Sequence, residues 1–213
     1  MKKRMTDEEK SELSTICRQL NISAVTLYAF SIENFKRTKG EVRALMQLFR
    51  VQFAILIDEL DQFDSQGICV QVSGRLELLP ADVQKMIAFV CLRTLKNEKF
   101  FLQICVSYTS RVEISDGIGQ IQSYFSQTQF QQHKVNQIDD RFISASLYSA
   151  TSIPLDLLIR TSNVTRLSDF QLWQSSFLSL LHWLHDFPWL RPYRNIHLNV
   201  ISYDSLGVEW EYY

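Results

Sequence analysis

Short apolar runs alternate along the chain with longer stretches in which apolar residues recur at helical spacing. Apolar runs of about four to eight residues are typical of buried strands, whereas a stripe that repeats every three to four positions is typical of a helix. The pattern predicts strands at residues 24–30, 68–72, 101–108 and 155–159, with a further strand at 197–201. It predicts helices at residues 41–60, 80–97, 113–125 and 169–185. We predict no element for the glutamine-rich residues 127–137.

The order of these elements predicts the fold class. Strands and helices that alternate in this way form a parallel sheet whose faces are covered by the helices. The 213 residues fit one domain of ordinary size, and the chain has no internal repeat, low-complexity segment or linker rich in glycine and proline. We therefore predict a single α/β domain, residues 1–213, with a mostly parallel central sheet and helices on both faces.

Composition narrows the functional classes. With 22 Lys and Arg against 23 Asp and Glu, the formal net charge is −1, so the chain lacks the positive field of a nucleic-acid-binding protein. Cysteines stand at positions 17, 69, 91 and 105 without a CxxC pair, which favours reduced core residues of an intracellular protein over disulfides or a zinc site. We recognise neither a signal peptide nor an apolar run long enough to span a bilayer.

The candidate chemistry lies in loops that follow the strands. Ligand sites of open α/β sheets lie beyond the carboxyl ends of the strands. Three predicted strands run into polar loops that contain arginine: residues 31–37 with Arg37, residues 109–111 with Arg111, and residues 160–168 with Arg160 and Arg166. These loops therefore form the candidate site.

Arg160 stands directly behind the apolar residues of a buried strand. Its guanidinium is suited to a planar or multi-oxygen anion, and the hydroxyls that follow it, with a helix start near Asp169, would complete a phosphate-type pocket. A second interpretation fits the pattern equally well: Arg160 pairs with Asp156 or Asp169, and Ser168 only caps the helix. The local pattern leaves both open.

Two other groups of side chains have simpler explanations. His182 and His185 are three positions apart on a predicted helix, but no third ligand stands at a recognisable spacing, so we assign no metal ligand. Cys69, Cys91 and Cys105 lie within apolar runs, which favours core packing over nucleophilic catalysis.

Four segments, taken in order, resemble the cis-prenyltransferase family. Residues 27–37, Leu-Tyr-Ala-Phe-Ser-Ile-Glu-Asn-Phe-Lys-Arg, are similar to its Tyr-Ala-Phe-Ser-x-Glu-Asn-aromatic-x-Arg segment. Residues 160–174, Arg-Thr-Ser-x-x-x-Arg-Leu-Ser-Asp-Phe-x-Leu-Trp-Gln, resemble its isopentenyl diphosphate-binding signature. Between them, Leu-Pro at residues 79–80 and Tyr-Thr-Ser-Arg-Val-Glu-Ile at residues 108–114 match in order. The resemblance covers roughly residues 22–189, and details of these segments resemble the eukaryotic branch of the family.

The resemblance implies prenyl transfer. The double bond of isopentenyl diphosphate would attack C1 of an allylic diphosphate such as farnesyl diphosphate, a proton would be lost, and a cis double bond would form. Repetition would give a long polyprenyl diphosphate, the precursor of dolichol. Two strongly anionic diphosphates held close together call for arginines and hydroxyls rather than for a buried pair of carboxylates.

The resemblance also implies roles for individual residues, by position. The isopentenyl diphosphate-binding residues would be Arg160, Arg166 and Ser168; the allylic diphosphate-binding residues would be Arg37 and Phe35; and the residues that position substrate or remove the proton would be Asn34 and Ser31. The helix at residues 41–60 would form a wall of the tunnel for the growing chain, although core packing explains much of its apolar stripe.

The chain departs from the family pattern in three places. It has no Asp-Gly-Asn-x-Arg loop, so Mg²⁺ is an implied cofactor whose usual aspartate ligand is absent, and we expect the chain to be N-terminally incomplete. Asn163 and Val164 replace the usual Gly-Glu of the signature. No Arg-x-Gly tripeptide ends the chain, so we expect a homodimer or heterodimer whose partner supplies it, and we treat residues 190–213 as a divergent C-terminal tail.

Two functional hypotheses follow from these agreements and departures. The first is a catalytic prenyltransferase subunit, in the cytoplasm or peripheral to the cytoplasmic face of the endoplasmic reticulum membrane; the match at Arg160, Arg166 and Ser168 favours it. The second is a catalytically silent interaction subunit or truncated isoform, which the missing aspartate loop favours. An unrelated phosphate-binding α/β enzyme is disfavoured by four motifs in the right order.

Overall fold

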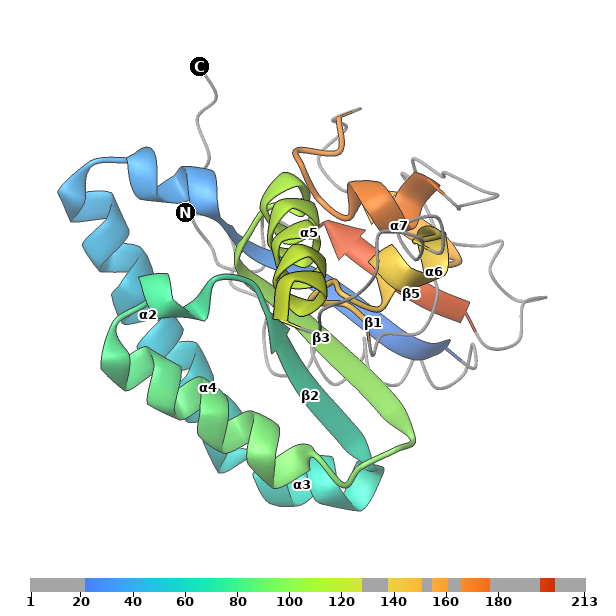
Figure 1. The fold of residues 1–213 in the computed structure, drawn as a ribbon. Coiled ribbons are helices and arrows are strands. Elements are labelled where there is room, and N and C mark those ends of the chain that lie inside the picture. Colours follow the sequence, from blue (N-terminus) through green and yellow to red (C-terminus); the bar gives the residue numbers. More distant parts are fainter. Residues whose placement is uncertain (1–21, 128–137, 151–154, 161–165, 177–195, 202–213) are drawn as a thin grey trace.

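The structure is a computed structural model that describes residues 22–127, 138–150, 155–160, 166–176 and 196–201. Five strands form one parallel sheet in the order β2-β3-β1-β5-β4 (Figure 1). The strands are β1 (Ile22–Ser31), β2 (Ile68–Ser73), β3 (Phe100–Tyr108), β4 (Leu157–Arg160) and β5 (Ile196–Ile201). Every strand predicted from the sequence is present, and the predicted parallel α/β class is confirmed.

Helices connect these strands. The α-helices are α2 (Lys39–Asp58), α3 (Leu60–Gln66), α4 (Ala81–Thr94), α5 (Ser110–Gln127), α6 (Asp140–Ser144) and α7 (Leu172–Ser176), and two short 3-10 helices are η1 (Ile32–Lys36) and η2 (Leu76–Leu78). The sequence pattern missed α3, α6, η1 and η2, because these helices are too short to repeat an apolar stripe. None of the helices in the described part of the chain is long and apolar enough to cross a membrane.

The predicted helix at residues 41–60 corresponds to α2, and α3 follows it. α2 begins after Thr38, whose hydroxyl accepts a hydrogen bond from the Glu41 backbone while the Glu41 carboxylate accepts one from Thr38 N–H. The chain leaves the helix at Glu59, and α3 then continues to Gly67, whose φ of 68° ends it in a left-handed conformation.

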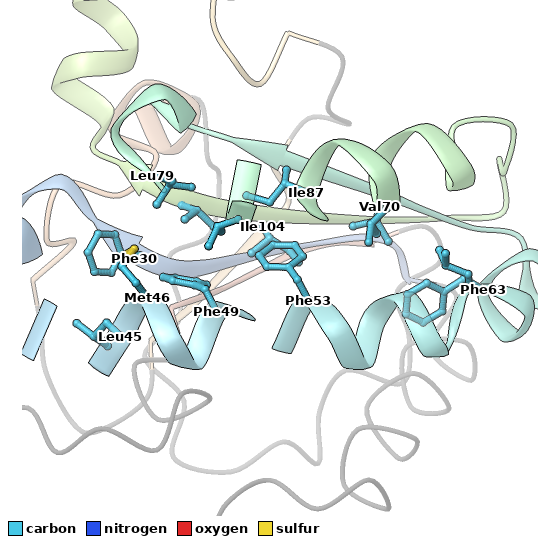
Figure 2. Packing of buried hydrophobic residues seen from close by; sticks show 14 of the residues in the cluster. Phe30, Leu45, Met46, Phe49, Phe53, Phe63, Val70, Leu79, Ile87 and Ile104 are labelled. Carbon is cyan, nitrogen blue, oxygen red and sulfur yellow. The ribbon is translucent and has the colours of Figure 1, made fainter. Parts of the chain in front are cut away.

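The main apolar core lies between α2, α4 and one face of the sheet (Figure 2). α2 contributes Leu45, Met46, Phe49 and Phe53; α4 contributes Val83, Ile87 and Val90; and the strands contribute Phe30, Ile68, Val70, Ile104 and Val106. These positions recur every three to four residues along the helices and every second residue along β3, as the sequence pattern predicts.

A smaller cluster covers the opposite face of the sheet and contains Tyr28, Cys105, Tyr108, Leu158 and Phe170. Cys105 belongs to this cluster while its neighbours Ile104 and Val106 belong to the main core, so the two clusters lie on opposite faces of β3. In β1 the register shifts between Tyr28, which pairs with Cys105, and Phe30, which pairs with Val106. This bulge moves Phe30 into the main core and sets the direction in which β1 enters the site loop.

The predictions for individual cysteines and histidines have different outcomes. Cys69 and Cys105 are buried and Cys91 is partly buried, and all three are free thiols, which agrees with core packing. Burial raises the pKa of the Cys105 thiol well above its usual value, so it stays protonated. Cys17, His182, His185 and the replacements at Asn163 and Val164 lie outside the described residues.

Candidate active site at the carboxyl edge of the sheet

Arg160 is the last residue of β4 rather than the first residue after it, and its side chain is buried at 3% exposure. Its Nη1 donates hydrogen bonds to Ser168 Oγ, at 2.8 Å, and to the backbone carbonyl of Arg166. The loop after β4 therefore turns back over the guanidinium. Three residues assigned to isopentenyl diphosphate, Arg160, Arg166 and Ser168, come together here, with the Arg166 side chain exposed to solvent.

The residues that follow Ser168 do not begin a helix. Ser168, Asp169 and Gln171 have positive φ angles of 50°, 60° and 44°, a left-handed conformation that is incompatible with a right-handed helix. α7 begins only at Leu172. The prediction that the helix starts near Asp169, and that its N-terminus lies there, is therefore wrong by three residues.

The competing interpretation of this loop is wrong in two of its parts. Asp169 pairs with Arg111, whose Nε lies 2.8 Å from Asp169 Oδ2 and whose backbone N–H donates to Oδ1 at 3.0 Å. Ser168 does not cap the helix, because the first helical N–H, that of Leu172, donates to Ser110 Oγ at 2.9 Å. The cap is thus supplied by the loop after β3, far away in the sequence.

The loop after β1 holds the residues assigned to the allylic diphosphate and to catalysis. Ser31 Oγ accepts a hydrogen bond from the Glu33 backbone at 3.2 Å, and Asn34 Oδ1 accepts one from Ser31 N–H at 2.8 Å. These reciprocal bonds cap η1 and fix the carboxamide of Asn34. Phe35 packs edge-on against Phe30, with ring centroids 4.9 Å apart, so it rests on the main core.

Arg37 follows η1 and lies at the start of α2. Its Nη1 is 3.4 Å from Glu41 Oε1, and its side chain is 24% exposed. Glu41 is itself held by Thr38, whose hydrogen bonds lower the pKa of the Glu41 carboxyl. Arg37 thus lies at the solvent-facing start of α2, beside the Glu41 carboxylate.

A buried carboxylate network supports the carboxyl edge of the sheet, and no sequence pattern predicted it. Glu113 of α5 is fully buried and accepts hydrogen bonds from Tyr108 Oη at 2.5 Å, from Gln174 Nε2 at 3.1 Å, and from Ser149 N–H and Oγ at 3.1 and 2.9 Å. Burial and the Glu113 carboxylate raise the pKa of Tyr108 well above its usual value, so Tyr108 donates. Tyr28 Oη in turn donates to the Tyr108 carbonyl at 3.0 Å.

A second network joins the loop after β2 to α5. Arg75 contacts Asp116 through both Nε, at 2.9 Å, and Nη2, and Tyr148 also donates to Asp116. The hydrogen bonds from Arg75 are the main cause that lowers the pKa of Asp116. Gly74 precedes Arg75 with a φ of 134°, and a Cβ there would lie 2.0 Å from the Val106 carbonyl. In the sequence, only the glycine directly after the strand, at position 74, indicates that the backbone here approaches another strand closely.

The carboxylates near the site do not fit a magnesium centre. Among the residues that the structure describes, no three His, Cys, Asp or Glu side chains gather as metal ligands. Asp169 is paired with Arg111, and Glu33 lies 2.5 Å from Lys36 Nζ. Mg²⁺ prefers several oxygen ligands that are not already neutralised by cations. The side chains described here therefore do not make the expected Mg²⁺ site.

Comparison with known families decides the relationship. The family model for putative undecaprenyl diphosphate synthase matches residues 4–202. The chain belongs to this prenyltransferase family. Members of the family generally depend on Mg²⁺, use isoprenyl diphosphates and are often dimeric.

Curated relatives support the assignment. The chain is 42% identical over 165 residues to the human dehydrodolichyl diphosphate synthase complex subunit, covering 78% of this chain and 49% of that protein. It is 38% identical over 176 residues to the geranylgeranyl-diphosphate-specific tritrans,polycis-undecaprenyl-diphosphate synthase of Methanocaldococcus jannaschii, covering 81% of this chain and 61% of the relative. The chain thus spans about half to three fifths of the length of these relatives.

Solved structures show the same fold. A probable undecaprenyl diphosphate synthase from Campylobacter jejuni has a TM-score of 0.66 and 26% identity, covering 84% of this chain and 78% of the other. Lavandulyl diphosphate synthase from Lavandula x intermedia, solved with dimethylallyl diphosphate, has a TM-score of 0.72 and 24% identity, covering 88% and 78%. The sheet described above is therefore the cis-prenyltransferase fold.

Proposed function

We propose that this chain is a prenyl-transferring subunit that condenses isopentenyl diphosphate with an allylic diphosphate. The observation that carries the proposal is the meeting of Arg160, Ser168 and Arg166 at the carboxyl edge of the sheet, in a chain of this family. A buried arginine at a strand end is costly, and a multi-oxygen anion that binds there would explain its position beside the Ser168 hydroxyl.

The geometry supports separate roles for the two polar loops. Arg160 donates to Ser168 Oγ at 2.8 Å, and we propose that this hydroxyl and the exposed Arg166 side chain contact the diphosphate of isopentenyl diphosphate. Arg37 is the proposed contact for the allylic diphosphate, where it balances the charge that develops as the C1–O bond breaks. The electrons of the isopentenyl double bond form the new C–C bond at C1, and a proton then leaves.

The roles of the remaining loop residues are proposed on the same basis. Asn34, held by its bond to Ser31 N–H, would orient the reacting isopentenyl group and the proton that it loses. Phe35 would form the apolar floor beneath the allylic chain, because it rests on Phe30 and the main core. The side chains that the structure describes do not form a Mg²⁺ site, so the proposed roles are those of the arginines, the hydroxyls and the Asn34 carboxamide.

Product and location are part of the proposal as well. The human relative is named as a dehydrodolichyl diphosphate synthase complex subunit. By analogy we propose a long polyprenyl diphosphate for dolichol synthesis, a homodimer or heterodimer whose partner supplies Arg-x-Gly, and peripheral association with the endoplasmic reticulum. A tunnel wall formed by α2 also stays a prediction: its Phe49 and Phe53 fill the core, while Ala44 and Ala54 are exposed on the other side.

Calorimetric titration of the 213-residue chain with isopentenyl diphosphate tests the proposed site. We expect Arg160→Gln and Arg166→Gln to weaken binding about ten- to a hundredfold, the loss of one charge-assisted contact. Arg166 is exposed, so its variant remains folded even where that of buried Arg160 does not. Arg93→Gln is the matched control, because Arg93 pairs with Asp64, 3.3 Å away, between α4 and α3. Equal affinity in Arg166→Gln, Arg93→Gln and the unaltered chain would refute the site.

A silent interaction subunit is the second candidate. The lack of a carboxylate cluster among the described side chains favours it. The assay is incorporation of labelled isopentenyl diphosphate into butanol-extractable product, with farnesyl diphosphate and Mg²⁺; a lack of turnover by the chain alone fits both candidates. We expect the chain alone to bind diphosphate without measurable elongation, because metal stabilisation contributes several kcal/mol and about 4 kcal/mol is already a thousandfold in rate. Robust turnover would exclude the silent subunit.

A further inference from the structure

The loop that carries Ser168 has an unusual backbone. Three of its four residues from Ser168 to Gln171 have left-handed φ angles, and none of the three is glycine. Non-glycine residues in this conformation are strained, and such strain persists only where surrounding contacts enforce it. Those contacts can therefore be identified residue by residue.

The contacts come from the turn between β3 and α5. Ser110 N–H donates to the Asp169 carbonyl at 2.8 Å, and Ser110 Oγ accepts from Leu172 N–H at 2.9 Å. Arg111 donates two hydrogen bonds to the Asp169 carboxylate, one from its backbone N–H, at 3.0 Å, and one from its side-chain Nε, at 2.8 Å. Two consecutive residues, Ser110 and Arg111, thus bind the loop within its strained segment, at Asp169, and directly after it, at Leu172.

The exposed fractions of the two side chains show that the ion pair between Arg111 and Asp169 restrains the loop residue, Asp169. The Asp169 side chain is 13% exposed, whereas the Arg111 side chain is 77% exposed. Between Asp169 and Gln171, Phe170 is fully buried and stacks on Tyr28 with ring centroids 4.7 Å apart. The loop is therefore held by the packing of buried Phe170 on Tyr28 and by the ion pair between Asp169 and Arg111.

Charge strengthens the Arg111 contact. The hydrogen bond that Arg111 donates to the Asp169 carboxylate is the main cause that raises the pKa of Arg111, with a further contribution from the negative charge of Glu33 in the loop after β1. The Arg111 guanidinium therefore lies within electrostatic reach of both substrate-site loops, those after β1 and β4.

We propose that Arg111 is a positioning residue for isopentenyl diphosphate. Through its ion pair with Asp169 it holds the left-handed loop in the conformation that presents Ser168 Oγ to Arg160 and to the ligand. The inference rests on the proposed function for its ligand, isopentenyl diphosphate. Its structural part, that Arg111 maintains the loop conformation, is independent of any ligand.

The test compares ways of removing the ion pair. Calorimetric titration with isopentenyl diphosphate should show affinity about three- to tenfold weaker in Arg111→Gln and in Asp169→Ala, the range of a partly exposed ion pair. The double variant should be no weaker than either single variant, because the two residues act as one unit. Arg111→Lys, which keeps the charge but loses the Nε contact, should recover part of the loss.

Glycine at position 169 separates the ion pair from the strain. Asp169→Gly removes the carboxylate but accepts a φ of 60° without cost, so it should bind isopentenyl diphosphate more tightly than Asp169→Ala does. If Asp169 mattered only as a charge, the two variants would bind equally. Equal affinity in these two variants, or unaltered affinity in Arg111→Gln, overturns the inference.

Amide hydrogen exchange supplies a readout without ligand. In Arg111→Gln the Leu172 amide, bonded to Ser110 Oγ, should exchange faster than in the unaltered chain, whereas Arg93→Gln should leave it unchanged. If the unaltered chain does not bind isopentenyl diphosphate, the proposed function fails, and exchange still decides whether Arg111 holds the loop. Unchanged Leu172 exchange in Arg111→Gln overturns the positioning role even where the proposed function stands.

Discussion

Different kinds of contact hold together two regions of the molecule. One is the apolar layer between α2, α4 and the sheet, and the other is the carboxyl edge of the sheet. The layer consists of aliphatic and aromatic side chains such as Phe53, Val70 and Ile87, which need volume and shape but no directional partner. The edge is held by Arg160, Arg111 and Glu113, each of which requires donors or acceptors at defined positions. We therefore expect substitutions in the layer to lower stability and those at the edge to change both stability and ligand binding.

The strongest test of this difference is Gly74→Ala. Gly74 has a φ of 134°, and a Cβ there would lie 2.0 Å from the Val106 carbonyl and 3.0 Å from the Ser107 carbonyl. Because the obstacle is backbone, we expect a loss of about 4 kcal/mol or more in the free energy of unfolding. Urea denaturation measures it.

Gly40→Ala is the control for this substitution. Gly40 lies in the first turn of α2, and an added Cβ would meet nothing within 4 Å. Alanine there should leave stability unchanged or raise it by up to about 1 kcal/mol. Similar losses in the Gly74 and Gly40 variants would contradict the close approach at Gly74.

Within the apolar layer, Ile87→Ala should have the next largest effect. Ile87 is buried on the inner side of α4 (Figure 2), and the shortened side chain leaves a cavity that costs about 3 kcal/mol. Urea denaturation is the measurement, with isopentenyl diphosphate affinity expected to be unchanged under folding conditions. Leu92→Ala on the same helix is the control: Leu92 is 71% exposed, so its loss should stay within about 0.5 kcal/mol. A Leu92→Ala loss as large as that of Ile87→Ala would show that our assignment of the inner side is wrong.

The same contrast explains what the sequence could predict. In the layer, the stripe of Leu45, Phe49 and Phe53 reports directly which side of α2 faces the sheet, because helical spacing alone determines it. The strand ends likewise identified Arg37, Arg111 and Arg160 as residues of one edge, because parallel strands bring their carboxyl ends together. The family resemblance then supplied the roles that periodicity could not.

At the edge, local pattern failed because the contacts are non-local. Asp169 looked like the first residue of a helix, but the backbone there is left-handed and is bound by Ser110 and Arg111, 58 or more positions away in the sequence. The pattern predicts Glu113 only as the start of a helix, and its buried carboxylate is bonded by Ser149 and Gln174, which are distant in the sequence. No spacing rule within one segment reports such partners.

Tyr108→Phe measures the value of one directional contact at the edge. The substitution removes a donor from the fully buried Glu113 carboxylate, so we expect a loss of about 1–3 kcal/mol in the free energy of unfolding. Tyr124→Phe, at a tyrosine that is 53% exposed on α5, should change stability by less than about 0.5 kcal/mol. Equal urea midpoints for the two variants would mean that the Glu113 network does not stabilise the edge.

The smallest expected effect is a pH dependence that the network of Arg75, Asp116 and Tyr148 contributes. Hydrogen bonds from Arg75 hold the pKa of Asp116 below its unfolded value, so the folded state favours the ionised form. This stabilisation is complete above the unfolded pKa, near 4, and is lost as pH falls through the lower folded pKa. Because both side chains are partly exposed, the contribution should not exceed about 1 kcal/mol.

Asp116→Asn should therefore lower stability at pH 7 and flatten the decline of stability below about pH 4, as followed by urea denaturation across pH. Asp61→Asn is the control, since Asp61 is fully exposed and 3.9 Å from Arg93. A decline below pH 4 as steep in Asp116→Asn as in the Asp61→Asn chain would show that the Arg75 contact does not stabilise the folded protein.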